Sequence, residues 1–170
     1  MSIINNKYAV YLPALNTNYA NALASKLPAM RPFPSGISLA DLAFWDKGSK
    51  LWDHEYFLHS IGQYSVGANP DNAVTRRSPR QGVLVGDSAG YQIGRWSLHG
   101  LTGLKTGMSG NNAIKAWSGN TKARQWIVNW LETYTNYAMT IDMPLWVTSQ
   151  KGVNSPFHKC SHNQLTRSEE

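Results

Sequence analysis

Residues 83–92 read Val-Leu-Val-Gly-Asp-Ser-Ala-Gly-Tyr-Gln, and this stretch decides how the fold of the chain is interpreted. Three apolar residues in a row, two of them β-branched, predict a short buried strand that ends at Asp87 and Ser88. In parallel α/β architectures the carboxyl ends of the strands carry the chemistry. Asp87 and Ser88 are therefore either candidate site residues or merely the cap of a following helix.

Further strands and helices are expected on both sides of this one. Residues 8–15 predict a first buried strand, followed by a helix that Asn16 or Asn18 caps and Pro28 ends. Residues 56–66 form another apolar stretch that contains His59, and its strand should neighbour the one at residue 83.

The clearest helix begins after Asn120 or Thr121, because the apolar residues behind it recur at helical spacing. They are Ala123, Trp126, Ile127, Trp130, Leu131 and Tyr134. Residues 137–147 then predict a strand with Asp142 near its end and Pro144 stopping the ladder. A carboxylate between Ile141 and Met143 is costly to bury unless it is paired, so Asp142 is either a satisfied structural residue or part of a site.

Composition limits the class of protein. A chain of 170 residues that is 42% hydrophobic fits one domain, and it has no apolar run of about 18 residues that could span a membrane. Its first residues lack the apolar core of a signal peptide and it has a single cysteine, Cys160, so we expect a cytoplasmic protein.

The net charge of +6 suits a polyanionic partner. Arg76, Arg77 and Arg80 cluster just before the strand at residue 83 and form either a nucleic-acid contact or a solvated loop. The Gly-rich region 94–110 has neither a G-x-G-x-x-G spacing nor a P-loop lysine, which excludes a nucleotide-phosphate site of either kind.

Asp87 and Asp142 end two successive predicted strands that flank one long helix. If the strands are parallel neighbours, both carboxylates project from the same edge and can serve acid–base or nucleophilic chemistry at an anomeric carbon. A carboxylate also accepts the paired N–H donors of a guanine edge. The ring of Tyr91 could lie against such a base.

These residues resemble the tRNA-guanine transglycosylases. Residues 87–92, Asp-Ser-Ala-Gly-Tyr-Gln, are similar to the family signature Asp-Ser-Gly-Gly-Tyr/Phe-Gln, and residues 137–142 are similar to its later strand that ends in an Asp. The sequences LPAL (residues 12–15), IDMPLW (141–146) and SPFHKCS (155–161) look closer to the branch of the family that acts on DNA, found in phages and bacterial genomic islands. The resemblance covers residues 82–93 and 137–147, and the remainder only through the order of the elements.

The resemblance implies a fold and an activity. The fold is an α/β, eight-stranded (β/α) TIM barrel with parallel strands and crossover helices, of which residues 1–170 would be a single incomplete domain, the N-terminal half. The activity is exchange of guanine for a 7-deazaguanine base in tRNA or DNA, by cleavage of the N-glycosidic bond through a covalent ribosyl–aspartate intermediate. The partners would be a nucleic acid and the deazaguanine base, with no membrane involved.

The resemblance also implies roles for individual residues. Asp87 would be the catalytic general acid/base and Asp142 would read the guanine-like edge. In substrate binding, Ser88 and Gly90 would line the ligand, Tyr91 would stack on it and Gln92 would support the turn. Ala89 stands where the family has its first Gly, a small change if this position has a negative φ.

The family's nucleophilic Asp and its zinc site of three cysteines and one histidine have no counterpart in these residues. We therefore expect no metal or cofactor within this chain and an inactive isolated fragment; the group around His158, Cys160 and His162 does not match a usual zinc spacing. Two other readings stay open. One is a non-catalytic nucleic-acid-binding module that uses the 76–80 loop, and the other is a glycoside hydrolase with Asp87 and Asp142 as its acid pair.

Overall fold

A four-stranded parallel sheet forms the centre of the computed structural model, in the order β1-β2-β3-β4. The strands are β1 (Ala14–Leu15), β2 (Tyr56–Ser60), β3 (Val83–Asp87) and β4 (Tyr137–Ala138). The structure describes residues 9–25, 33–95, 97–103, 108, 110–141, 143–144, 146–149, 155–157 and 160. Each strand pairs with its sequence neighbour, so the connections all step in one direction across the sheet.

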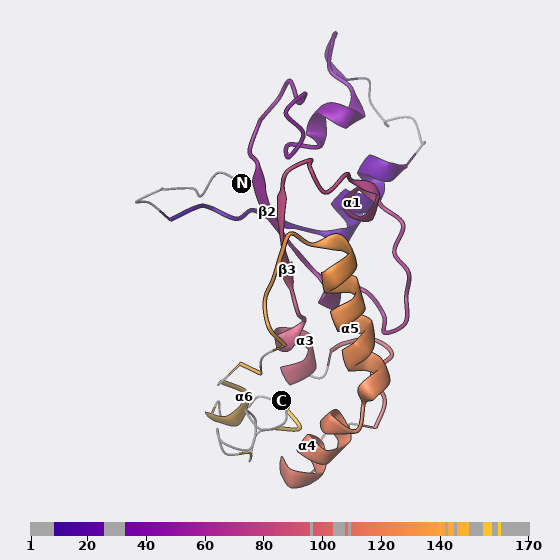
Figure 1. Ribbon diagram of the computed structural model, residues 1–170, viewed down its shortest axis with the longest axis vertical. Helices are drawn as coiled ribbons and strands as arrows, with labels where there is room; N and C mark the ends of the chain where they lie inside the picture. Colours follow the sequence, from indigo (N-terminus) through magenta and orange to yellow (C-terminus); the bar gives the residue numbers. More distant parts are fainter. Residues whose placement is uncertain are drawn as a thin grey trace.

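The helices connect the strands as crossovers. α1 (Thr17–Ala24) follows β1 and α2 (Ala73–Arg76) precedes β3, while α3 (Gly90–Gly94), α4 (Gly110–Ser118) and α5 (Thr121–Tyr134) lie between β3 and β4. Shorter elements are the 3₁₀ helices η1 (Leu39–Leu42) and η2 (Ile61–Gln63), and the helix α6 (Trp146–Ser149). Figure 1 shows α1 and α5 on the same side of β2 and β3.

Local chemistry explains where α1 begins, and a periodic apolar stripe explains α5. The side chain of Asn16 accepts a hydrogen bond from the backbone N–H of Asn18, as predicted for an N-cap. α5 begins at Thr121, and its periodic residues Ala123, Ile127, Trp130 and Leu131 are buried. The prediction of this helix from residue 121 to residue 134 is confirmed.

The helices that the structure describes cover one face of the sheet. Phe57, His59 and Leu84 are fully buried, and a Cβ placed on Gly86 would lie 2.6 Å from the side chain of Leu131 in α5. Of the strand residues that alternate with them, Ser60 at the end of β2 is buried and the others in β2 and β3 are half-buried, while Tyr137 of β4 and Met139 just after it are 64% and 41% exposed. We call this second surface, formed by Tyr56, Leu58, Val83, Val85, Asp87, Tyr137 and Met139, the uncovered face.

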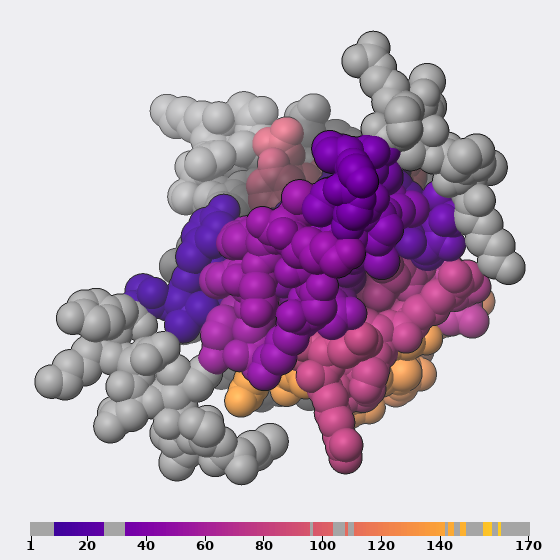
Figure 2. Space-filling view, turned by 90° about the horizontal axis from the view of Figure 1, so that it is seen from above, coloured from indigo at the N-terminus to yellow at the C-terminus, as the bar shows by residue number. Residues whose placement is uncertain are grey.

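The strand direction divides the molecule into two ends. The amino end holds the segments 43–55 and 77–82, which lead into β2 and β3, and the carboxyl end holds α3 and α4. Figure 1 shows these ends at opposite extremes of the long axis. Figure 2 looks down on the amino end, where purple residues between α1 and β2 occupy the middle of the view.

Two predicted strands are much shorter than expected, and for residues 137–147 most of the prediction is wrong. β4 has two residues and helix α6 begins at Trp146. Beyond Met139, whose N–H donates to the Gly86 carbonyl, the Thr140 carbonyl accepts a hydrogen bond from the Ser88 hydroxyl instead of a strand N–H, because β3 has already turned into α3. β1 pairs over two residues only, and Pro13, just before it, has no N–H to donate.

The predicted α/β class is therefore confirmed as a parallel sheet with crossover helices.

Candidate active site

Asp87 is the last residue of β3 and belongs to the uncovered face. Its neighbour Gly86 points to α5, so the alternation of the strand places the Asp87 carboxylate on the opposite side. In the register Asp87 lies beside Ser60 at the end of β2. Its side chain is half-buried and no residue in the described part of the chain forms a hydrogen bond or ion pair with it. A carboxylate in this position can exchange a proton with a ligand that enters from the uncovered face.

Ser88 fixes the end of β4 to the end of β3. It is fully buried, and its hydroxyl donates a hydrogen bond of 2.8 Å to the backbone carbonyl of Thr140. Thr140 precedes Asp142 by two residues in the sequence. Asp142 itself lies outside the described residues.

The turn after Ser88 has a strained backbone. Ala89 has φ 70° and ψ 18°, in the left-handed region, and it is the one non-glycine residue of the described chain with a positive φ. The condition under which an Ala here would be a small change, a negative φ, is therefore not met. Left-handed backbone costs an L-residue about 1–2 kcal/mol, and strain of this kind gathers at functional sites.

Gly90 begins α3, and the next two residues point in different directions. The ring of Tyr91 is 55% exposed, and the guanidinium of Arg95, one turn later, lies 6.0 Å from its centroid. The side chain of Gln92 packs against Gly62 at the end of β2, where an added Cβ would lie 2.6 Å from the Gln92 amide. Tyr91 is thus placed to meet a ligand from solvent, whereas Gln92 joins α3 to η2.

A buried polar chain lies under the carboxyl end of β2, and sequence reasoning foresaw only its histidine. His59 Nδ1 is 3.0 Å from the Leu15 carbonyl and Nε2 is 2.7 Å from the Tyr64 hydroxyl, to which Asn72 Nδ2 donates at 2.8 Å. Because a carbonyl can only accept, Nδ1 carries the proton and Nε2 accepts from Tyr64. Burial lowers the pKa of His59 and raises that of Tyr64. His59 is therefore a neutral structural residue in this fold.

Gln63 supports the junction of β1 with α1 from the same side. Its Nε2 donates to the Leu15 carbonyl at 2.8 Å, and its Oε1 accepts from the Thr17 N–H at 2.7 Å. This junction borders an open depression of about 370 Å³ at the carboxyl ends of β1 and β2. Its lining is mostly polar: Asn16, Thr17, Asn18, Gly62, Gln63, Ser97 and His99. Neither Gln63 nor this depression had a signal in the sequence, because the partners are more than forty residues apart.

The arginine cluster before β3 lies at the other end of the sheet from Asp87. Arg76 is paired with Asp71, which lowers the pKa of the Asp71 carboxyl. Arg77 donates to the carbonyls of Tyr134 and Ser78, and its guanidinium lies over the Phe57 ring. Two of the three arginines thus have partners within the fold.

Three cysteines are needed for the zinc site that the family resemblance implies, and this chain has one. Cys160 is buried in the larger hydrophobic core, and burial raises the pKa of its thiol. The residues present do not fit that zinc site. Within the residues that the structure describes, no group of three His, Cys, Asp or Glu side chains could hold a metal ion.

Comparison of the chain with protein-family models, curated proteins and solved structures finds no match. In the described part of the chain, no helix is both long enough and apolar enough to cross a membrane.

Proposed function

We propose that this chain is the N-terminal part of a guanine transglycosylase that exchanges guanine for a 7-deazaguanine base in tRNA or DNA. One observation carries the proposal. The Asp87 carboxylate stands at the carboxyl end of an inner parallel strand, on a sheet face that no described helix covers, and has no partner among the described residues. The carboxyl ends of parallel strands are where ligands bind in α/β folds.

The order of the strands supports the proposed barrel. Strands in sequential order, with the helices on one face, have the arrangement of consecutive β/α units of a barrel. The uncovered face, with Leu58, Val85 and Tyr137 in one row of the register, would be the barrel interior. Parallel sheets normally have both faces covered, and closure by further strands would cover this one.

The residues of the 87–92 segment then receive distinct roles. Asp87 moves the proton that the departing guanine needs and the incoming base must lose, as a general acid and base. Tyr91 lays its exposed ring on the base. The Ser88 hydroxyl is engaged with Thr140, so Ser88 acts through the position of the 139–141 segment. Gly90 and Gln92 keep α3 close to η2, and Asp142 reads the guanine edge.

The test is base exchange by the full-length parent protein. Asp87→Asn and Asp142→Asn should each lower the incorporation of radiolabelled guanine into tRNA or DNA by at least about 100-fold, the usual loss for a removed acid–base group. Asp53→Asn, at the amino end, removes the same charge and should change nothing. Incorporation at the wild-type rate in both site variants would remove the assignment.

The 170-residue chain alone should exchange no base, since the resemblance places the nucleophile in a later part of the barrel. The 76–80 loop does not favour the alternative of a nucleic-acid-binding module built on it, because Arg76 and Arg77 are bound within the fold.

A further inference from the structure

The positive charge of the chain is concentrated in one segment. Residues 88–131 contain five of the sixteen Lys and Arg residues and none of the ten acidic residues. They therefore carry +5 of the net charge of +6, and the other 126 residues are almost neutral. This segment runs from the end of β3 through α3 and α4 into α5, so it begins directly after Asp87 and includes the carboxyl end of the molecule.

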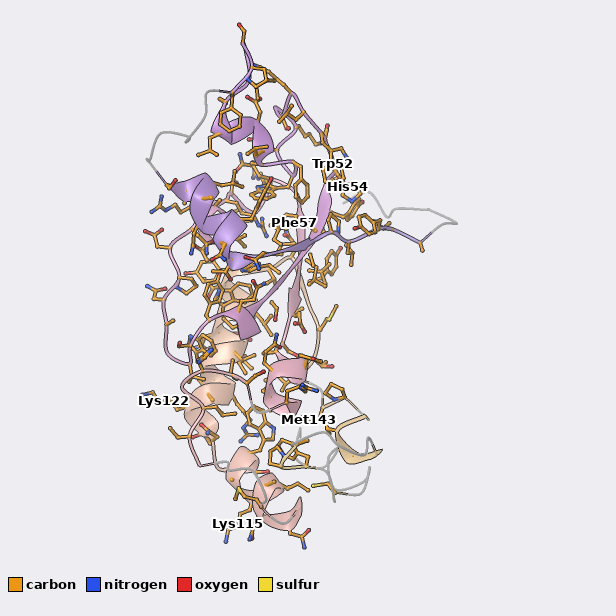
Figure 3. All side chains as sticks on the ribbon, turned by 180° about the vertical axis from the view of Figure 1, so that it is seen from behind. Trp52, His54, Phe57, Lys115, Lys122 and Met143 are labelled. Atoms are coloured by element: carbon orange, nitrogen blue, oxygen red, sulfur yellow. The ribbon has the colours of Figure 1, made fainter. Side chains whose placement is uncertain are left out.

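Three of these cationic side chains are exposed. Arg95, Lys115 and Lys122 are exposed, and none of them has an ion-pair partner in the described part of the chain. Figure 3 labels Lys115 and Lys122 toward the carboxyl end, away from Trp52 and His54. Asp87 and Glu132 are the acidic residues nearest in sequence, and Glu132 lies in the last turn of α5.

The start of α5 gives a second reason to expect an anion here. Its first turn contains Lys122 and no acidic residue, and Asn120 makes no side-chain cap hydrogen bond. The unpaired N–H groups at a helix N-terminus carry partial positive charge, so a lysine there is unfavourable unless an anion approaches. Arg124 adds a further charge two residues on, where it donates to the Ser118 carbonyl at the end of α4.

The chemistry of this surface fits a nucleic acid better than a membrane or an acidic protein. Of the large apolar side chains of residues 88–131 that the structure describes, Tyr91 is the one that is exposed, so no apolar face accompanies the lysines as lipid insertion requires. Tyr91 has Arg95 over its ring, and aromatic and arginine faces at the same end of the molecule as exposed lysines suit unstacked bases on a phosphate backbone.

We propose that Arg95, Lys115 and Lys122 form the surface that binds the phosphate backbone of the nucleic acid, on the same end of the sheet as Asp87. The inference rests on the proposed function for the identity of the substrate, but its test measures binding alone. It replaces the 76–80 loop as the nucleic-acid contact.

The experiment compares two double variants that remove equal charge from opposite ends of the chain. Lys115→Gln with Lys122→Gln alters the proposed surface, and Lys47→Gln with Arg80→Gln alters exposed residues at the amino end. Binding of a fluorescent 20-nucleotide single strand and of a 20-base-pair duplex is measured by anisotropy between 50 and 200 mM salt. Circular dichroism melting checks that both variants are folded.

The first variant should bind the duplex at least about tenfold more weakly at 50 mM salt, with a log–log salt slope smaller by about 1.8, which is two phosphate contacts. The second should match the wild type. Equal weakening in both variants would mean that only net charge matters, and would overturn the proposal. So would absent binding by the wild type, or competition by poly-L-glutamate or phosphatidylserine vesicles as strong as by unlabelled duplex at equal charge.

Failure of the proposed function would look different. Asp87→Asn should leave the Kd and the salt slope unchanged, whatever it does to base exchange in the parent protein. If that parent exchanges no base while Lys115→Gln with Lys122→Gln still lowers the slope, the binding surface stands and the transglycosylase assignment falls.

Discussion

At the scale of single residues, the imidazole of His59 shows how the end of β2 is held. It is fully buried, and its two nitrogens join β1 to η2 by way of the Leu15 carbonyl and the Tyr64 hydroxyl. A protonated ring would have to donate from Nε2, to which Tyr64 itself donates in this arrangement. The neutral form is therefore the one that the fold requires.

This gives a pH dependence with a definite sign. The pKa of His59 is lowered in the folded protein, so between that value and the unfolded value of about 6.5 the unfolded chain binds more protons. The stability that His59 contributes is complete above about pH 6.5 and decreases as the pH falls toward the folded pKa. His59→Gln, which cannot titrate, should flatten the free energy of unfolding between pH 7.5 and 5.5, measured by urea denaturation. His54→Gln, at a half-buried histidine of the amino end, is the control substitution. Equal slopes in the wild type and His59→Gln would contradict the assignment.

The left-handed backbone conformation of Ala89 could not be predicted from the local sequence. Asp-Ser-Ala-Gly indicates a turn, but a left-handed residue would be expected at Gly90 rather than at Ala89. In the structure Gly90 is the first residue of α3, so the reversal that starts the helix falls one residue earlier. The Ala89 methyl is fully buried in the core, which compensates part of the backbone cost.

At the scale of elements, the contact between β3 and α5 depends on the absence of a side chain at Gly86. A Cβ there would lie 2.5 Å from the Thr135 methyl and 2.6 Å from a Leu131 methyl. Gly86→Ala should therefore push α5 away and cost about 1–3 kcal/mol of unfolding free energy, as over-packing usually does.

A second substitution at Thr135 tests whether the overlap with its methyl group causes this destabilisation. Thr135→Ser removes the closer methyl and keeps the hydroxyl that donates to the Leu131 carbonyl. The double variant should recover part of the loss measured for Gly86→Ala by urea denaturation. Gly48→Ala, where an added Cβ would make one ordinary contact of 3.7 Å, should stay within about 0.5 kcal/mol of the wild type. No recovery in the double variant would show that another contact is responsible.

Elements whose pattern is local were predicted well, and those decided by distant partners were not. α5 has a full apolar stripe and β3 an apolar run, so both follow from neighbouring residues. Residues 137–147 also form an apolar run, but the strand ends after Ala138 because the Thr140 carbonyl bonds to Ser88, more than fifty residues away. Arg77 is similar: its partner carbonyl at Tyr134 is 57 residues distant, and nothing around residue 77 indicates it.

The candidate site divides in the same way. That Asp87 ends a parallel strand, next to the strand of His59, was predictable from apolar runs and turn residues. That its side chain belongs to the uncovered face depends on Gly86 facing α5, which requires the packed helix.

At the scale of the whole molecule, the two faces of the sheet differ in what covers them. One face packs against helices, while the row formed by Leu58, Val85 and Tyr137 crosses the other. Parallel sheets rarely leave an apolar face in water. This asymmetry leads to different expectations for the 170-residue chain and for a parent protein in which further strands close the sheet.

Two neighbouring substitutions in β3 distinguish these cases. Leu84 is fully buried against the helices, so Leu84→Lys should unfold the 170-residue chain, because an unpaired buried charge costs several kcal/mol. Val85 is half-buried on the uncovered face, where a lysine can reach water, so Val85→Lys should cost less than about 1 kcal/mol by urea denaturation.

In the full-length parent the same Val85→Lys would place its charge in a barrel interior, and it should be as damaging there as Leu84→Lys. If Val85→Lys also unfolds the 170-residue chain, something already covers that face, and sedimentation of the wild type would show whether it is a second copy. If Val85→Lys is tolerated in the parent as well, the sheet does not close over this face, and the barrel is lost from the proposal.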